Sequence, residues 1–130
     1  MKSIITLFSV LLMLFSLAVF SGCKKEPDTL QVNDVASDPG AFEGALNVVG
    51  VVNAYSQSDP TILGIMDKKE LLCTTPNCNK VLLPVQFTGN RPALGDEIMV
   101  SGTFQHLSGG LVFKADTMEV LASHGLGGLK

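Results

Sequence analysis

Two cysteines that stand close together near the middle of the chain are the residues with the clearest chemical potential. Cys73 and Cys78 enclose four residues, of which Pro76 and Asn77 favour a reversal of the chain. A reversal brings the two Cα atoms into the range that a disulfide bridges. The same spacing suits two thiolate ligands of a metal such as zinc, although structural zinc prefers four ligands. The pair therefore predicts a disulfide or, as the alternative, part of a metal site.

The other ionisable residues form no catalytic motif. The sequence holds no Gly-x-Ser-x-Gly, no His-Glu-x-x-His and no phosphate-binding loop, and it has two histidines. Asp67, Glu70, Asp96 and Glu97 lie in expected turns, where a carboxylate is more often solvated than part of a general acid/base pair. We therefore expect a protein that is not an enzyme.

Charge and aromatic content argue against a nucleic-acid partner. The chain has a net charge of −3, and an acidic domain repels a polyanion. Phe87, Phe104 and Phe113 fall in expected strands of a small barrel, where such side chains usually fill the interior rather than stack on bases. We expect an unknown small ligand or a protein partner, and no nucleic acid.

The N-terminal segment is apolar, and it contributes to a mean hydropathy of +0.37 for the whole chain. Residues 3–22 contain no charged residue, no proline and no histidine, and Ser21-Gly22 directly precedes Cys23. One interpretation is an uncleaved transmembrane helix, because the apolar run is near the minimum length for a span. The other is a cleaved leader with a cationic start and small residues before the cleavage site.

Ser21-Gly22-Cys23 resembles the lipobox of a bacterial lipoprotein signal peptide, with Phe20 in place of the usual leucine. The resemblance implies that residues 1–22 are removed and that the Cys23 thiol receives a diacylglycerol, which anchors the chain in membrane lipid. It places the protein on a bacterial membrane, facing the periplasm or the cell exterior. Lys24 after the cysteine resembles the enterobacterial pattern for outer-membrane sorting, which implies the outer membrane if the host is Gram-negative. Residues 23–30 then form a lipidated tether.

An exported location affects which of the two interpretations of Cys73 and Cys78 is favoured. Lipidation of Cys23 leaves Cys73 and Cys78 as a pair in an oxidising compartment, which favours the disulfide.

The mature chain is predicted to form one all-β domain. After a turn-rich or short helical segment at 32–44, β-branched and alternating residues predict five strands and no long helix. The expected strands are residues 46–55, 61–67, 81–87, 97–104 and 111–121. Their buried faces are expected to contain Val49, Val51, Ile65, Val85, Ile98, Val100, Phe104 and Phe113.

The order of these features resembles the OB-fold, a small five-stranded antiparallel barrel. The resemblance rests on a long first strand with Gly50 at its middle, expected to mark a bulge or bend, and on Gly95-Asp96 followed by a strand and Gly102. It covers about residues 44–121. We expect an OB-like domain at 31–122 and a flexible tail at 123–130.

The last strand and the residues after it resemble the periplasmic haem chaperone of cytochrome c maturation, a membrane-anchored OB-fold. Glu119-Val120-Leu121-Ala122-Ser123-His124 matches its Glu-Val-Leu-Ala-Lys-His, with serine in place of lysine. The resemblance implies that His124 is a candidate for covalent haem capture. The sequence thus predicts a membrane-anchored lipoprotein with a non-catalytic binding or accessory module and no bound cofactor. The alternative is an accessory protein that handles haem or a metal.

Overall fold

The computed structural model describes residues 28–73, 75–78 and 80–125. The predicted leader 1–22 and the predicted lipidation residue Cys23 lie outside the described residues, as does most of the predicted tail. Among the described residues, no helix is long and apolar enough to cross a bilayer.

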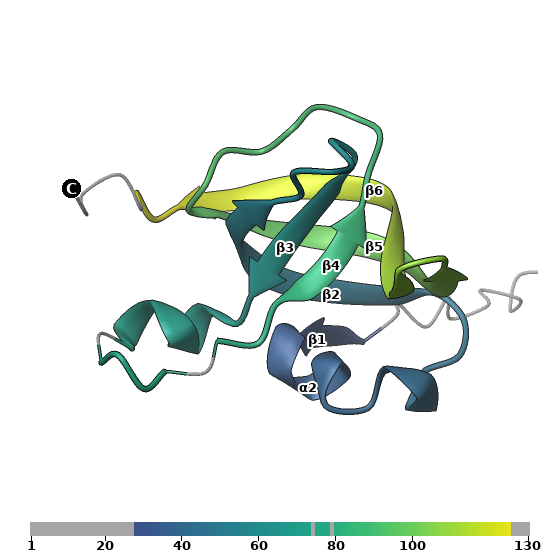
Figure 1. Cartoon of the computed structure of the whole chain (residues 1–130), viewed down its shortest axis with the longest axis horizontal. Coiled ribbons are helices and arrows are strands. Elements are labelled where there is room, and N and C mark those ends of the chain that lie inside the picture. The colour runs from purple at the N-terminus through teal and green to yellow at the C-terminus, as the bar shows by residue number, and fades with distance from the viewer. Residues whose placement is uncertain (1–27, 74, 79, 126–130) are drawn as a thin grey trace, which may run out of the picture.

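The described chain forms six strands and three short helical segments (Figure 1). In chain order the elements are β1 (Thr29–Gln31), α2 (Val32–Ala36), the 3-10 helix η2 (Pro39–Ala41), β2 (Leu46–Tyr55), β3 (Ile62–Met66), the 3-10 helix η3 (Lys68–Leu72), β4 (Leu83–Gln86), β5 (Asp96–Leu107) and β6 (Gly110–Ser123).

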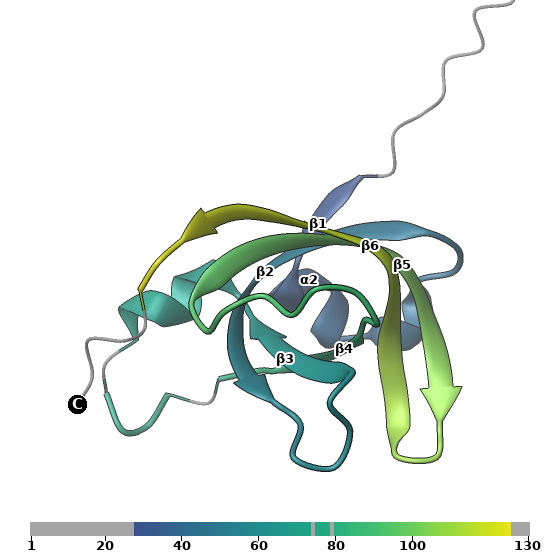
Figure 2. The same cartoon turned by 90° about the horizontal axis from the view of Figure 1, so that it is seen from above.

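Five of the strands close into a ring (Figure 2). The order in the sheet is β1-β2-β3-β4-β6-β5, and β5 returns to pair with β2. All neighbours in the ring are antiparallel except β4 and β6, which are parallel. Five strands closed in this order form the OB-like barrel that the sequence predicted, and the all-β fold class is confirmed.

A sixth strand lies in the segment predicted as tether. Thr29 and Leu30 pair in parallel with Asn47 and Val48, so ordered structure begins before the predicted domain boundary at residue 31. At the other end, β6 extends through Ser123, the first residue of the predicted tail.

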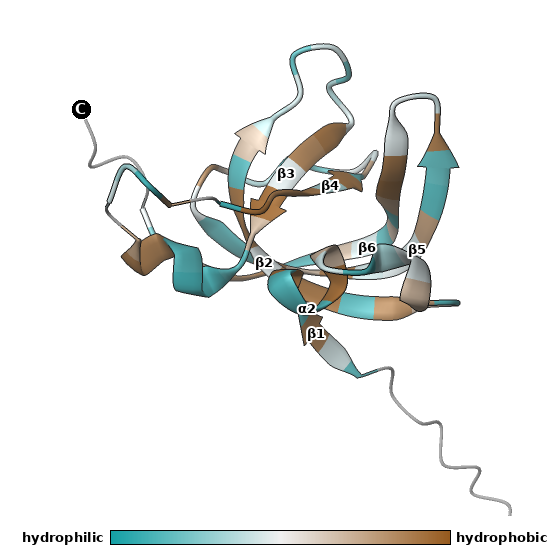
Figure 3. Cartoon of the chain, turned by 60° about the horizontal axis from the view of Figure 1, so that its bottom comes forward, coloured by the Kyte–Doolittle hydropathy of each residue, from teal (hydrophilic) through white to brown (hydrophobic). Residues whose placement is uncertain are grey.

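The barrel interior is filled by aliphatic side chains and one buried aromatic ring. Phe113 is fully buried, and its ring meets that of the partly buried Phe104 edge to face at 5.2 Å. Figure 3 shows hydrophobic residues along β3 and β4. The other predicted core residues are all buried. On β2, however, the contiguous core contains Val48 and Val52, whereas Val49 and Val51 are buried on the opposite face of the strand.

Gly50 lies on the same face of β2 as Val48 and Val52, and its missing side chain leaves room there for α2. A Cβ at Gly50 would lie 2.6 Å from a methyl group of Val32 and 3.0 Å from the backbone oxygen of Met66. Val32 and Val35 of α2 are fully buried in the core, so α2 packs directly against this point of β2. The register shift of β2 against β3 falls between Val52 and Ala54. Gly50 therefore serves a close approach of α2, not the bulge that the sequence suggested.

Candidate functional site

The site lies beside η3, which leaves the barrel directly after β3. Asp67 precedes η3 and is buried, and its two carboxylate oxygens accept bonds from the backbone N–H of Lys69 at 3.0 Å and of Asn33 at 3.4 Å. The first bond fixes the start of η3, and the second ties it to α2. At the other end the Cys73 N–H donates to the Glu70 carbonyl at 3.2 Å. Both ends of η3 are therefore held.

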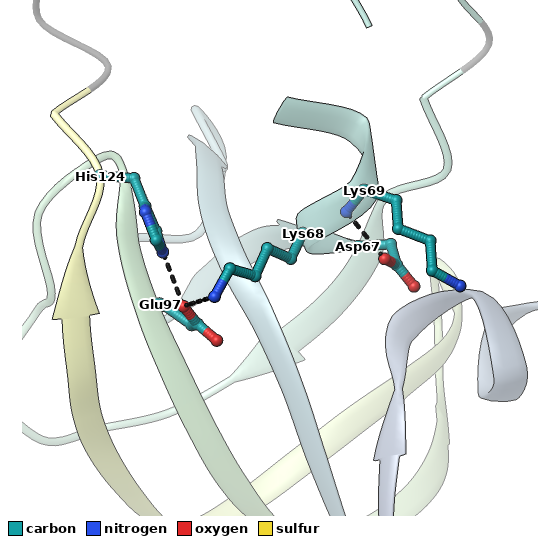
Figure 4. Close-up of polar contacts among 5 residues, drawn as sticks. All are labelled: Asp67, Lys68, Lys69, Glu97 and His124. Carbon is teal, nitrogen blue, oxygen red and sulfur yellow. Dashed lines mark hydrogen bonds and ion pairs between the residues drawn. The ribbon is translucent and has the colours of Figure 1, made fainter. Parts of the chain in front are cut away.

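Three elements meet at the carboxylate of Glu97 (Figure 4). Glu97 Oε2, on β5, lies 3.0 Å from Nζ of Lys68 on η3 and 2.6 Å from Nε2 of His124, which follows β6. The backbone N–H of His124 also donates to the Gly95 carbonyl at 2.9 Å. The bond with His124, followed by that with Lys68, holds the pKa of Glu97 below its ordinary value against the opposing effect of burial.

A cleft of about 470 Å³ opens next to this cluster. Its walls are almost entirely apolar, and Leu72 on its rim is 86% exposed. Figure 3 shows the hydrophobic end of η3 at the outer side of the molecule. We call this the η3 cleft. It is lined by Gln31, Asp67, Lys68, Lys69, Leu71, Leu72 and His124.

The cysteine pair is adjacent to the cleft in the chain. Cys73 and Cys78 form a disulfide, as predicted, with their Cα atoms 6.2 Å apart. In this structure the two sulfurs are bonded to each other, and the alternative in which both are thiolate ligands of zinc stays a prediction. The described residues contain no group of three or more His, Cys, Asp or Glu side chains that could hold a metal ion.

The structure changes the interpretation of three other residues. Asp67 and Glu97 were expected to be solvated turn carboxylates, but both are buried and bonded. His124 was placed in a flexible tail, yet its side chain is 25% exposed and bound to Glu97. No local pattern marks this cluster, because residues 68, 97 and 124 come together only when the strands are paired.

Comparisons with known proteins give fold-level likeness alone. No protein-family model and no curated protein matches the chain. Among solved structures, the chain is similar to one from a replication protein A heterotrimer bound to single-stranded DNA, with 15% identity over 65% of this chain and 62% of that one, and a TM-score of 0.40.

A second similar structure is a putative aspartyl-tRNA synthetase from Leishmania major Friedlin. It has 11% identity over 82% of this chain and 23% of the other, with a TM-score of 0.45. This chain thus spans less than two thirds of either protein. At these identities the likeness says nothing of what this chain binds.

Proposed function

We propose that this protein is a membrane-anchored bacterial lipoprotein whose OB-like barrel acts, without catalysis, as a binding module on the extracytoplasmic side. Its ligand is a small, mostly apolar molecule that occupies the η3 cleft. The proposal joins two parts, a binding site and an anchor, which are tested separately.

The observation that carries the binding site is the η3 cleft itself. Its volume of about 470 Å³ and its apolar walls are typical of small-molecule sites, which add a few polar groups for orientation. Leu72 remains 86% exposed although burial of a leucine stabilises by about 1.5 to 3 kcal/mol. A bound apolar molecule would cover Leu72 and recover part of that free energy. Lys68 and Lys69, which line the cleft, bring two positively charged side chains to it.

Support for a non-catalytic role comes from the partners of the ionisable groups. Glu97 accepts from both Lys68 and His124, and Asp67 accepts from two backbone N–H groups. These contacts join β5, η3, α2 and the end of β6. The carboxylates therefore act as structural links beside the cleft, rather than as a proton relay aimed into it.

Support for the anchor is Ser21-Gly22-Cys23 and its distance from the barrel. Thr29, the first residue of β1, is six residues after Cys23. An extended chain of that length reaches about 20 Å. A lipid on Cys23 would thus hold the barrel against the membrane surface.

The binding site is tested by native mass spectrometry of protein extracted from its own host. We expect a bound small molecule that is lost in Leu72→Asp, because a carboxylate on the rim disfavours an apolar ligand. Leu107→Asp is the matched control, since Leu107 is 38% exposed on the hairpin between β5 and β6. A ligand retained in Leu72→Asp, or no ligand in the native protein, would exclude the η3 cleft.

The same preparation tests the alternative in which His124 captures haem. His124 lies on the wall of an apolar cleft, which is the observation in its favour, but Nε2 is bound to Glu97 and must leave it before it can form a covalent bond with haem. If His124 captures haem, we expect a visible absorbance band that is lost in His124→Ala. A spectrum without that band would leave the small apolar ligand as the occupant.

A further inference from the structure

The second half of β6 has a free edge. The strand β4 pairs with β6 only through Val85 with Phe113 and Gln86 with Lys114. Beyond Lys114, β6 continues to Ser123 and pairs with β5 on its other side. Residues 116–123 therefore present one edge with which no strand of the described chain pairs (Figures 1 and 2).

This edge is exposed to solvent and holds no lysine or proline. Every residue from 116 to 123 is exposed except the half-buried Met118, and Val120 and Leu121 are 52% and 47% exposed. Natural edge strands are commonly short or carry lysine or proline, which discourages pairing with another chain. Residues 116–123 hold neither, and their register against β5 shifts at Asp116 and again at Leu121.

A pocket of about 430 Å³ lies along the same edge. Met118 and Val120, alternate residues of β6, form one wall, and residues 90–93 of the loop between β4 and β5 form the other. The walls are mixed, with polar and apolar surface in similar amounts. We call it the β6 pocket, and it shares no lining residue with the η3 cleft.

The loop that faces β6 is held in place. The Tyr55 hydroxyl donates to the Pro92 carbonyl at 2.7 Å, and the Arg91 guanidinium lies 3.7 Å from the centre of the Tyr55 ring. A carboxylate oxygen of Asp96 accepts from the Ala93 N–H at 2.9 Å. The β6 pocket is thus a preformed space beside the free edge of β6.

We propose that the free edge of β6 binds an extended, basic peptide segment of a partner protein, which adds as a further strand. Backbone hydrogen bonds along residues 116–123 supply affinity, and one apolar side chain of the peptide enters the β6 pocket. Lysine or arginine side chains at alternate positions of the peptide face the carboxylate of Glu119, and Asp116 adds a second carboxylate at the start of the edge. Asp96 adds a third carboxylate on the pocket wall. Among the described residues that line the wall, the one cationic residue, Arg91, is already stacked on the Tyr55 ring.

Charge also decides between a partner peptide and a second copy of this chain. Two copies paired through β6 would bring together two strands that each carry Asp116 and Glu119, and like charges across a strand pair destabilise it. A basic peptide would instead place opposite charges across the strand pair, which stabilises it.

The test uses protein extracted in mild detergent and a synthetic peptide of alternating lysine and valine. Calorimetry measures binding, and amide hydrogen exchange reports residues 116–123. We expect saturable binding with protection of these amides. A glutamate-valine peptide is expected to bind at least tenfold more weakly, as is a lysine-valine peptide with a central proline.

Variants of the protein locate the site. Val120→Lys places a lysine on the edge and at the pocket, and we expect at least a tenfold loss of affinity for the lysine-valine peptide. Val81→Lys is the control, because Val81 is 44% exposed but lies outside both pockets, and its affinity is expected to be unchanged. Equal binding by both variants, or no binding by the native protein, would overturn the proposal. So would concentration-dependent dimerisation that Val120→Lys abolishes, which would assign the edge to a second copy.

Discussion

Glu97 is the residue through which η3, β5 and the end of β6 are joined. Its side chain is only 12% exposed and holds two partners on one oxygen. Because those partners lower its pKa in the folded protein, ionised Glu97 stabilises the fold. This stabilisation is fully present above the ordinary glutamate value near 4.5, and it is lost as the pH falls through the lower folded pKa.

Glu97→Gln tests this link. At pH 7 we expect a decrease of about 1 to 3 kcal/mol in the free energy of unfolding, because charge-assisted bonds are lost from a buried group. Below the ordinary glutamate pKa the difference between the variant and the native protein should shrink. Urea unfolding followed by circular dichroism at several pH values measures it. Glu119→Gln, on an exposed position of β6, should differ little at any pH, and a pH-independent effect of Glu97→Gln would refute the assignment.

Gly50 gives a steric test at the same scale. Gly50→Ala places a methyl group against Val32 and the Met66 backbone, and we expect a loss of about 1 to 3 kcal/mol through overpacking. Gly64→Ala is a matched control on β3, since its Cβ would meet nothing closer than 3.6 Å. Chemical denaturation of the two variants compares them directly. Equal stability of both variants would show that α2 does not pack closely against β2 at Gly50.

At the scale of elements, the disulfide stiffens the loop that continues η3. It closes a short ring, for which chain entropy predicts about 2 kcal/mol. Replacing both Cys73 and Cys78 by serine should therefore cost no more than about this amount and leave the barrel intact, because the core residues lie elsewhere. Urea unfolding and the far-ultraviolet dichroism spectrum check both points. Loss of the β-sheet signal would mean that the loop is required for folding.

The elements also show what the sequence could and could not predict. Alternation along residues 97–104 and the glycine positions were enough to predict strands and the barrel. The strand β1 has only three residues and no pattern, and its pairing with Asn47 depends on a distant part of the chain. The face of β2 was misjudged because both faces are valine-rich and buried. The Glu97 cluster depends on tertiary pairing, which local patterns do not encode.

At the scale of the whole molecule, the proposed lipid on Cys23 would set where the barrel can be. If Cys23 carries two or three acyl chains, each buried methylene contributes about 0.8 kcal/mol and the attachment is stable. We expect intact-mass measurement of the extracted protein to find an acylated Cys23 at its N-terminus. Cys23→Ser should lack the lipid, whereas the double serine variant of Cys73 and Cys78 should keep it.

Another N-terminus would contradict the anchor. An unprocessed chain that stays in the membrane with Cys23→Ser would instead support the transmembrane helix.

The closure of the ring also constrains how the chain folds. Val48 pairs with Val100, and Val85 pairs with Phe113, so both closing contacts join distant parts of the sequence. Folding that depends on such non-local pairs is slow, whereas β5 and β6 form a local hairpin. A nascent chain cannot complete the barrel until its final strand has emerged. If the chain is exported as we propose, this order keeps the barrel incomplete until almost all of the chain has been translocated.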